Sequence, residues 1–290
     1  MLTVAFLVDV AVPVTLVLVM TTMGVNLVLS QLFGTLRQVY RCLGLTLLQF
    51  ALLVPCAMAV GAILDLDPVL AMMLIAIAAA PGGALSTVYT FLARGNLELS
   101  VMLTTMSTVA ATLLSPALVL LAAGVLNLDT GGGAMNFTSV SRDLALFMLL
   151  PLLAGVSISW FAPVLADRLR QVSSAIASTA ILCLIAMSVI VCAPFLSQAL
   201  PAMVVTGGVL TAVSFGIGKL VSHLCAPRDR SAVMLEFGVR NLPVALILIG
   251  GAAPDVRTVA YLLVYFVVST TLLLAVSLFL RKATLRPVES

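Results

Sequence analysis

The sequence has few charges and few of the residues that usually carry enzyme chemistry. Only 9% of its 290 residues are charged, and it holds a single histidine. It contains neither a Gly-Lys-Ser phosphate loop nor a cysteine–histidine cluster, and its five cysteines lack metal-ligand spacing. Its basic residues fall in short segments between apolar runs, so the net charge of +3 does not indicate a nucleic-acid partner. These absences argue against an enzyme, a cofactor and a nucleic-acid partner.

Apolar residues dominate what remains. They make up 62% of the chain, and the mean hydropathy is +1.27. A membrane span needs about 20 mostly apolar residues. The sequence therefore predicts an all-α polytopic protein, embedded as a monomer in a lipid bilayer that we expect to be a bacterial inner membrane. Nine spans are predicted, at residues 4–29, 42–63, 69–93, 98–126, 143–161, 172–194, 201–225, 231–252 and 257–280.

Basic residues are concentrated in alternate loops. The segments after the odd-numbered spans carry Arg37, Arg41, Arg94, Arg168, Arg170, Arg228, Arg230, Arg281, Lys282 and Arg286. The opposite loops carry Asp65, Asp67, Asp129, Arg142, Asp255 and Arg257. Because loops rich in Lys and Arg stay in the cytoplasm, we expect the N-terminus outside and the C-terminus in the cytoplasm.

Two predicted spans contain helix breakers. Pro81-Gly82-Gly83 interrupts the third span, because proline removes a backbone donor and glycine frees the backbone. Pro243 disfavours helix at the residue before it, so we expect the eighth span to break just after Arg240. Each break is followed by one more long span. This pattern predicts two inverted repeats, residues 1–126 with a break near 81–83 and residues 143–281 with a break near 240–243. On this division the first repeat lacks its opening helix.

Charged and polar side chains accompany both breaks. A charge at the bilayer midplane costs about 2.5–3.5 kcal/mol on insertion scales and usually marks an ion or substrate path. Glu236 and Arg240 are spaced i, i+4 and would share a helical face. They could be only a structural ion pair, but the neighbouring break favours a functional role. Gln49 in the second span could make an interhelical hydrogen bond or act as a ligand.

Four hydroxyl side chains follow the first break, namely Ser86, Thr87, Ser100 and Thr104. Hydroxyls in membrane helices often bond only the carbonyl four residues earlier. Converging with Glu236, however, they would offer the oxygen ligands that a hard cation prefers.

These segments resemble the bile acid:sodium symporter family over essentially the whole chain. The segments that resemble its fourth and fifth helices are Pro81–Thr87, Phe91–Asn96, Leu99-Ser100 and Thr104. Glu236–Asn241 is similar to its ninth-helix motif, Glu-x-Gly-x-Gln-Asn. Gln49-Phe50 with Pro55 resembles its third helix, and Met23–Leu27 its second.

The resemblance implies a panel domain and a core domain, with the two broken helices crossing in the core. It also implies alternating access, with sodium as the coupling ion and a small organic anion as substrate. One implied sodium site uses Ser86, Thr87, Ser100, Thr104 and Glu236. The second uses Gln49, Glu236, Arg240 and the carbonyls of Phe237 and Val239. The substrate would meet the N-termini of the half-helices at Ala84, Ser86, Arg240 and Asn241, where helix dipoles favour an anion.

The sequence departs from the family pattern at four points. It has nine predicted spans where the family has ten, and Thr87 replaces an asparagine. Arg240 replaces a glutamine, which puts a cation where a second sodium ligand belongs. Phe266 and Val267 replace polar side chains of the bile-acid-binding relatives.

We therefore expect a symporter of small monocarboxylates, keto acids or pantoate-like acids, coupled to one sodium because of Arg240. The alternatives are a sodium-independent carrier, or a non-transporting membrane sensor or interaction protein of the same fold. An exporter related by fold to arsenite or auxin carriers and an intramembrane enzyme acting through Glu236 alone also stay open.

Overall fold

The computed structural model describes residues 4–26, 36–126, 137–250 and 256–284 as helices joined by short turns, without a β-strand in these ranges. Eight helical stretches are long and apolar enough to span a membrane. A ninth candidate is the pair α5 and α6, bent by 66°. The expectation of an all-α polytopic membrane protein is confirmed.

The elements follow the predicted spans closely. In chain order they are α1 (Val4–Phe6), the π-helical turn η1 (Leu7–Ala11), α2 (Val12–Asn26), α4 (Leu36–Ile63), α5 (Pro68–Ala79), α6 (Ala84–Leu92), α7 (Leu97–Val125), α8 (Phe137–Leu144), the π-helical turn η2 (Ala145–Leu149), α9 (Leu150–Phe161), α10 (Pro163–Ser222), the 3₁₀ turn η3 (Pro227–Asp229), α11 (Arg230–Gly238), α12 (Leu242–Gly250) and α13 (Val256–Thr284).

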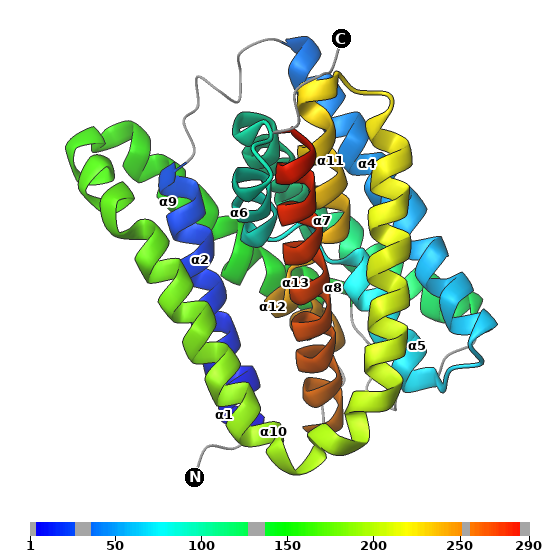
Figure 1. Cartoon of the computed structure of the whole chain (residues 1–290). Helices are drawn as coiled ribbons and strands as arrows, with labels where there is room; N and C mark the ends of the chain where they lie inside the picture. The colour runs from blue at the N-terminus through cyan, green and yellow to red at the C-terminus, as the bar shows by residue number, and fades with distance from the viewer. Residues whose placement is uncertain (1–3, 27–35, 127–136, 251–255, 285–290) are drawn as a thin grey trace.

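The sixth and seventh predicted spans correspond to Ala175–Pro194 and Met203–Ser222, and both lie within one continuous helix. α10 runs for 60 residues, and Figure 1 shows it descending, turning back and ascending again. Pro194 and Pro201 lie inside it. Each proline removes one backbone hydrogen bond and kinks a helix without ending it when the neighbouring turns persist. The chain therefore reverses direction without a loop.

The helices form two groups (Figure 1). One contains α2, α9 and the first half of α10, and we call it the panel group. The other contains α4 to α7, the second half of α10, and α11 to α13, and we call it the core group. In the panel group the backbones of α2 and α9 touch, since a Cβ on Gly24 would lie 2.2 Å from the Leu152 carbonyl oxygen. Only small residues permit such an approach between membrane helices.

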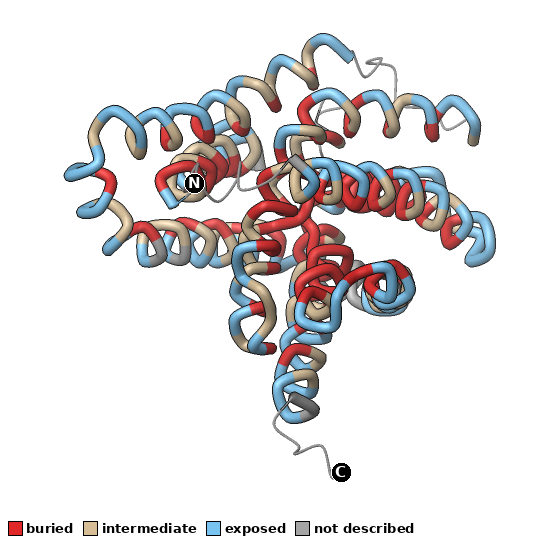
Figure 2. Tube along the Cα trace, turned by 90° about the horizontal axis from the view of Figure 1, so that it is seen from above, coloured by how far each residue is buried: buried red, intermediate tan, exposed pale blue. Residues whose placement is uncertain are grey.

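The two helix breaks meet in the core group. The backbone N–H of Asn241 donates to the Pro81 carbonyl at 3.0 Å. α5 packs against α12 and α6 against α11, so each half-helix faces the opposite half of the other broken span. In Figure 2 the buried residues gather around this central region. The inverted-repeat division at 1–126 and 143–281 stays a prediction.

The second break begins earlier than expected. α11 ends at Gly238 and Val239 is extended, whereas the sequence predicted helix through Arg240. The reason is Pro243, whose ring would clash with the carbonyl of the residue four positions earlier, Val239, if the helix continued. The first break matches expectation, with α5 ending at Ala79 and α6 beginning at Ala84.

The predicted topology can be tested at exposed residues at the two ends of the helices. α1 and the end of α13 lie at opposite ends of the molecule (Figure 1). On a background lacking the five native cysteines, we expect Asp65→Cys to react with an impermeant maleimide from outside intact cells. Arg228→Cys, also at an exposed position, should react only after permeabilisation. Labelling of both from one side would contradict the topology.

Candidate functional site

A carboxylate surrounded by hydroxyls lies where the breaks meet. Glu236 on α11 is 1% exposed. Its Oε2 accepts hydrogen bonds from the Ser86 hydroxyl at 2.6 Å and the Thr104 hydroxyl at 2.7 Å, and these two hydroxyls are 3.0 Å apart. Its Oε1 accepts from the Ser107 hydroxyl at 3.3 Å. We call Glu236, Ser86, Thr104 and Ser107 the oxygen cluster. It joins α6, α7 and α11 around groups that suit a hard cation.

The first break leaves room for this carboxylate. A Cβ on Gly82 would lie 1.8 Å from Glu236 Oε1. No side chain can occupy that position without displacing the carboxylate, so Gly82 is required for close approach as well as for breaking the helix.

The other two hydroxyls of the first implied sodium site lie beside the cluster. The Ser100 hydroxyl donates to Thr87 Oγ1 at 3.3 Å. Thr87 is half-buried and lines a cavity. Neither side chain has a hydrogen bond to Glu236 among those found in the described residues. Ser86, Thr104 and Glu236 are therefore in direct contact, with Thr87 and Ser100 paired next to them.

Other hydroxyls on α7 make the hydrogen bond that is common in membrane helices, to the backbone carbonyl one turn earlier. Thr105 and Thr108 bond the carbonyls four residues earlier, at 2.7 Å each. Ser107, which the sequence analysis did not select, contacts the carboxylate. It lies one helical turn beyond Thr104, and this spacing is the one signal that could have identified it.

Gln49 makes an interhelical contact. It is 2% exposed on α4, and its side-chain amide donates to the Glu236 backbone carbonyl at 3.2 Å. Its predicted role as a sodium ligand is not tested by this contact, but the residue does lie at the second implied site.

Arg240 does not pair with Glu236. The expected i, i+4 pair requires both residues in one helix, and α11 ends before Arg240. Within the described chain, none of the ion pairs joins these two side chains. The Arg240 guanidinium instead donates to the Phe237 carbonyl and, at 3.3 Å, to the Ala80 carbonyl. The interpretation that Glu236 and Arg240 form a structural ion pair is therefore wrong.

These contacts satisfy the carbonyls at the end of α5. Ser115 on α7 donates to the Ala79 carbonyl at 2.6 Å. Arg240 donates to the carbonyl of Ala80, and the Asn241 N–H to that of Pro81. The last carbonyls of a helix have no partner within it and carry the negative end of its dipole. Arg240 is thus a buried cation placed at the C-terminal ends of two half-helices, α5 and α11.

Two cavities lie between the panel and core groups. One is lined by the starts of α6 and α12, by Arg240 and Asn241, and by residues of α2, α10 and α13 that include Phe266. The other, of about 380 Å³, lies alongside α6 and is lined by Thr87 and Thr104. Both share Ala84.

The predicted substrate residues lie partly in the first cavity and partly in the oxygen cluster. Ala84, Arg240 and Asn241 line the first cavity, whereas Ser86 is fully buried in the oxygen cluster. Arg240 Nε has no hydrogen-bond partner in the described part of the chain. The first cavity is therefore lined by two half-helix N-termini and by a cationic residue, and this combination suits an anion.

Comparison with known families agrees with the resemblance seen in the sequence. The family model described as the Sodium Bile acid symporter family matches residues 13–200. This segment runs from α2 into α10 and includes the first break and the α7 hydroxyls. The second break lies beyond it.

Curated relatives carry related descriptions. The chain is 34% identical over 171 residues to a probable sodium/metabolite cotransporter, BASS1, of Arabidopsis thaliana chloroplasts, covering 58% of the chain and 41% of that protein. It is 30% identical over 203 residues to the uncharacterized sodium-dependent transporter YocS of Bacillus subtilis, covering 67% and 56%. It is 26% identical over 233 residues to the human ileal sodium/bile acid cotransporter, covering 78% and 65%. The chain thus spans 41% to 65% of the length of these relatives.

The close approach of Gly82 to Glu236 leads to a test of the oxygen cluster. We expect Gly82→Ala to lower sodium affinity by about 5- to 100-fold, because overpacking commonly costs about 1–3 kcal/mol and here displaces the carboxylate. The measurement is the increase in melting temperature of the purified protein when sodium chloride replaces potassium chloride. Gly124→Ala is the matched control, since nothing lies within 4 Å of an added Cβ there. Equal sodium responses in the two variants would contradict a role for the cluster in binding sodium.

Proposed function

Because the chain belongs to the sodium bile acid symporter family, we propose that it transports small organic anions across the membrane with sodium as the coupling ion. The observation that carries this proposal is the oxygen cluster. A carboxylate buried at membrane depth is costly unless it is paired. Among the described residues Glu236 has hydroxyl donors but no cationic partner, so a bound sodium ion would complete its environment.

The proposed sodium position uses Glu236, Ser86 and Thr104, with Thr87 and Ser100 close enough to join after small rotamer changes. Hard cations prefer several oxygen ligands, so additional hydroxyls next to Glu236 would complete the coordination. Thr87 lines the larger cavity together with Thr104, and this gives an ion a route to the cluster.

We propose that the second sodium is replaced by Arg240. Its guanidinium stays charged in proteins and already bonds the Phe237 carbonyl, one of the oxygens implied for the second site. A sodium ion about 4 Å away would be repelled by about 4 kcal/mol at an effective dielectric constant of about 20. The site that Gln49, Glu236, Phe237, Val239 and Arg240 would form is therefore occupied by a tethered cation.

The substrate carboxylate would bind in the first cavity, which Ala84, Asn241 and Arg240 line. Phe266 lines this cavity, whereas Val267 is 50% exposed and does not. The first cavity holds about 50 Å³ and the cavity beside it about 380 Å³, so their small size, with Phe266 in the lining, favours small carboxylates over steroids.

Transport would proceed by movement of the core group against the panel group. Both cavities lie between the groups. A relative movement could therefore open the substrate position to either side while the crossing of the two breaks stays intact within the core.

The stoichiometry can be measured in proteoliposomes. We expect substrate uptake to depend on sodium with a Hill slope near one. Arg240→Gln should raise this slope toward two, because it restores a neutral amide and removes the repulsion.

Arg257→Gln, at an exposed position on α13, is the matched control and should leave the slope unchanged. Glu236→Gln should abolish the sodium response, because it replaces the one anionic oxygen donor of the cluster. A slope above one in the unmodified protein that Arg240→Gln does not change would show that Arg240 has only a structural role.

Counterflow of radiolabelled anions separates a carrier from a sensor of the same fold, because only a carrier exchanges its substrate. We expect exchange of small keto or hydroxy acids and no saturable micromolar binding of a taurine-conjugated steroid. Phe266→Ala should widen the range of accepted acids. Binding without exchange of any small carboxylate would favour the sensor.

A further inference from the structure

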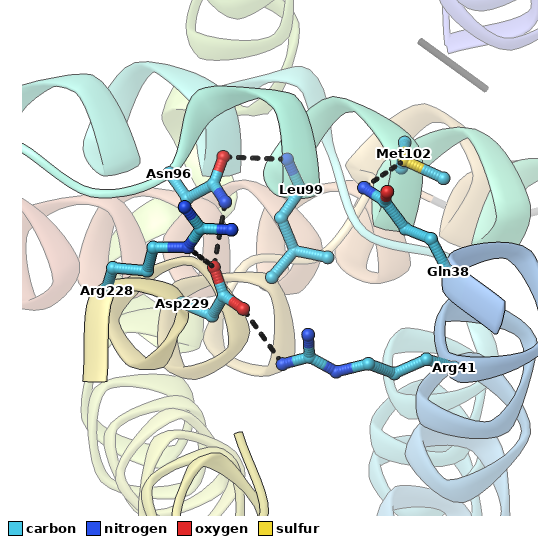
Figure 3. Close-up of polar contacts among 7 residues, drawn as sticks. All are labelled: Gln38, Arg41, Asn96, Leu99, Met102, Arg228 and Asp229. Atoms are coloured by element: carbon cyan, nitrogen blue, oxygen red, sulfur yellow. Dashed lines mark hydrogen bonds and ion pairs between the residues drawn. The ribbon is translucent and has the colours of Figure 1, made fainter. Parts of the chain in front are cut away.

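A second buried carboxylate lies on the same helical segment as Glu236. Asp229, at the start of α11, is 3% exposed. Its Oδ2 pairs with the Arg41 guanidinium of α4 at 2.9 Å, and its Oδ1 accepts from the Asn96 side-chain amide at 2.8 Å. Arg228 Nε lies 3.7 Å away and is 83% exposed. Figure 3 shows Asp229 between Arg41 and Asn96, which approach it from separate elements.

Asn96 has two roles in this arrangement. While its amide nitrogen donates to Asp229, its oxygen accepts from the Leu99 N–H at 3.2 Å and so caps α7 (Figure 3). The tight turn before it packs against α11, since a Cβ on Gly95 would lie 2.2 Å from the Ser231 hydroxyl. The N-termini of α7 and α11 are therefore held together.

The same two helices meet again at the oxygen cluster. Asp229 and Glu236 are seven residues apart, which is about two turns or 10 Å along a helix. Asn96, Ser100 and Thr104 follow one another at i, i+4 along α7. α7 and α11 thus touch through Asn96–Asp229 at their ends and through Thr104–Glu236 two turns further on. A shift at the first contact displaces the second.

We propose that Asp229, Arg41 and Asn96 are positioning residues for sodium, forming a clasp that sets the register of α4, α7 and α11 at the oxygen cluster. Arg41 brings in α4, the helix whose Gln49 bonds the Glu236 carbonyl. Through these contacts α4, α7 and α11 are all tied to the Asp229 carboxylate. The inference rests on the proposed sodium coupling and adds residues that do not touch the ion.

Two variants weaken the clasp in different ways. Arg41→Gln removes the cation. Asn96→Asp keeps a side-chain oxygen that can cap α7. It replaces the amide that donates to Asp229 with a second negative charge, so it disrupts the contact with Asp229 while leaving the helix cap in place. Partners that orient metal ligands commonly change metal affinity by about 10- to 100-fold. Because the clasp lies further from the ion, we expect each variant to raise the half-saturating sodium concentration by about tenfold.

The readout is sodium-dependent thermal stabilisation of the full-length protein, titrated with sodium chloride against potassium chloride at constant ionic strength. Arg228→Gln is the matched control on the same carboxylate and should change the sodium requirement by less than about twofold, as expected for an exposed pair. Arg41→Lys keeps the cation and should recover part of the affinity lost in Arg41→Gln. Substrate affinity at saturating sodium should stay unchanged in all four variants.

The outcomes distinguish the clasp from the function on which it rests. A lower melting temperature in potassium chloride with an unchanged sodium requirement in Arg41→Gln and Asn96→Asp would make the three residues purely structural and overturn the proposal. If the unmodified protein is not stabilised by sodium, the proposed coupling fails and the clasp fails with it. A tenfold rise in both variants, with partial recovery in Arg41→Lys, supports the clasp.

Discussion

Backbone carbonyls at membrane depth need partners within the protein, and the two helix breaks leave several that no helix satisfies. The structure meets this constraint by setting one break against the other. Asn241 supplies an N–H to the Pro81 carbonyl, and Arg240 supplies donors to the carbonyls of Ala80 and Phe237. Neither break could stand alone in lipid. The two broken spans therefore form one structural unit, and the candidate site lies where they are joined.

The same junction determines what each charged group can do. Gly82 leaves the space that the Glu236 carboxylate occupies. This carboxylate faces hydroxyls on α6 and α7, while Arg240 faces the C-terminal ends of α5 and α11. Cations are stabilised at such helix ends, so Arg240 does not need Glu236 as a partner. The negative charge of Glu236 remains available to an ion, which an internal salt bridge would have neutralised.

Much of this arrangement could be predicted from the sequence, since the nine apolar runs, both breakers and the Ser86, Thr104 and Glu236 set depend on composition and local chemistry. The i, i+4 pairing of Glu236 with Arg240 failed because spacing has meaning only inside a continuous helix, and Pro243 ends that helix earlier. The reversal between the sixth and seventh spans was expected, but the continuity of α10 through it was not, because Pro194 and Pro201 suggest a loop when the neighbouring packing is unknown. Ser107 and the Asp229 clasp depend on how α7 and α11 are rotated against each other, which a single sequence does not specify.

The proposed replacement of a second sodium ion by the Arg240 guanidinium also changes the energetics of the transport cycle. Moving one net elementary charge across the membrane potential is worth about 2.3 kcal/mol per 100 mV. A monocarboxylate carried with two sodium ions moves one net positive charge, whereas with one sodium ion it moves none. In the proposed cycle Arg240 would move with the core group in both the loaded and the empty step, so its own charge would cancel over the cycle. On the proposed stoichiometry, accumulation of substrate would then be driven by the sodium concentration gradient alone. The membrane potential would then not contribute to substrate accumulation, and the second site would be held permanently in place by the Arg240 cation.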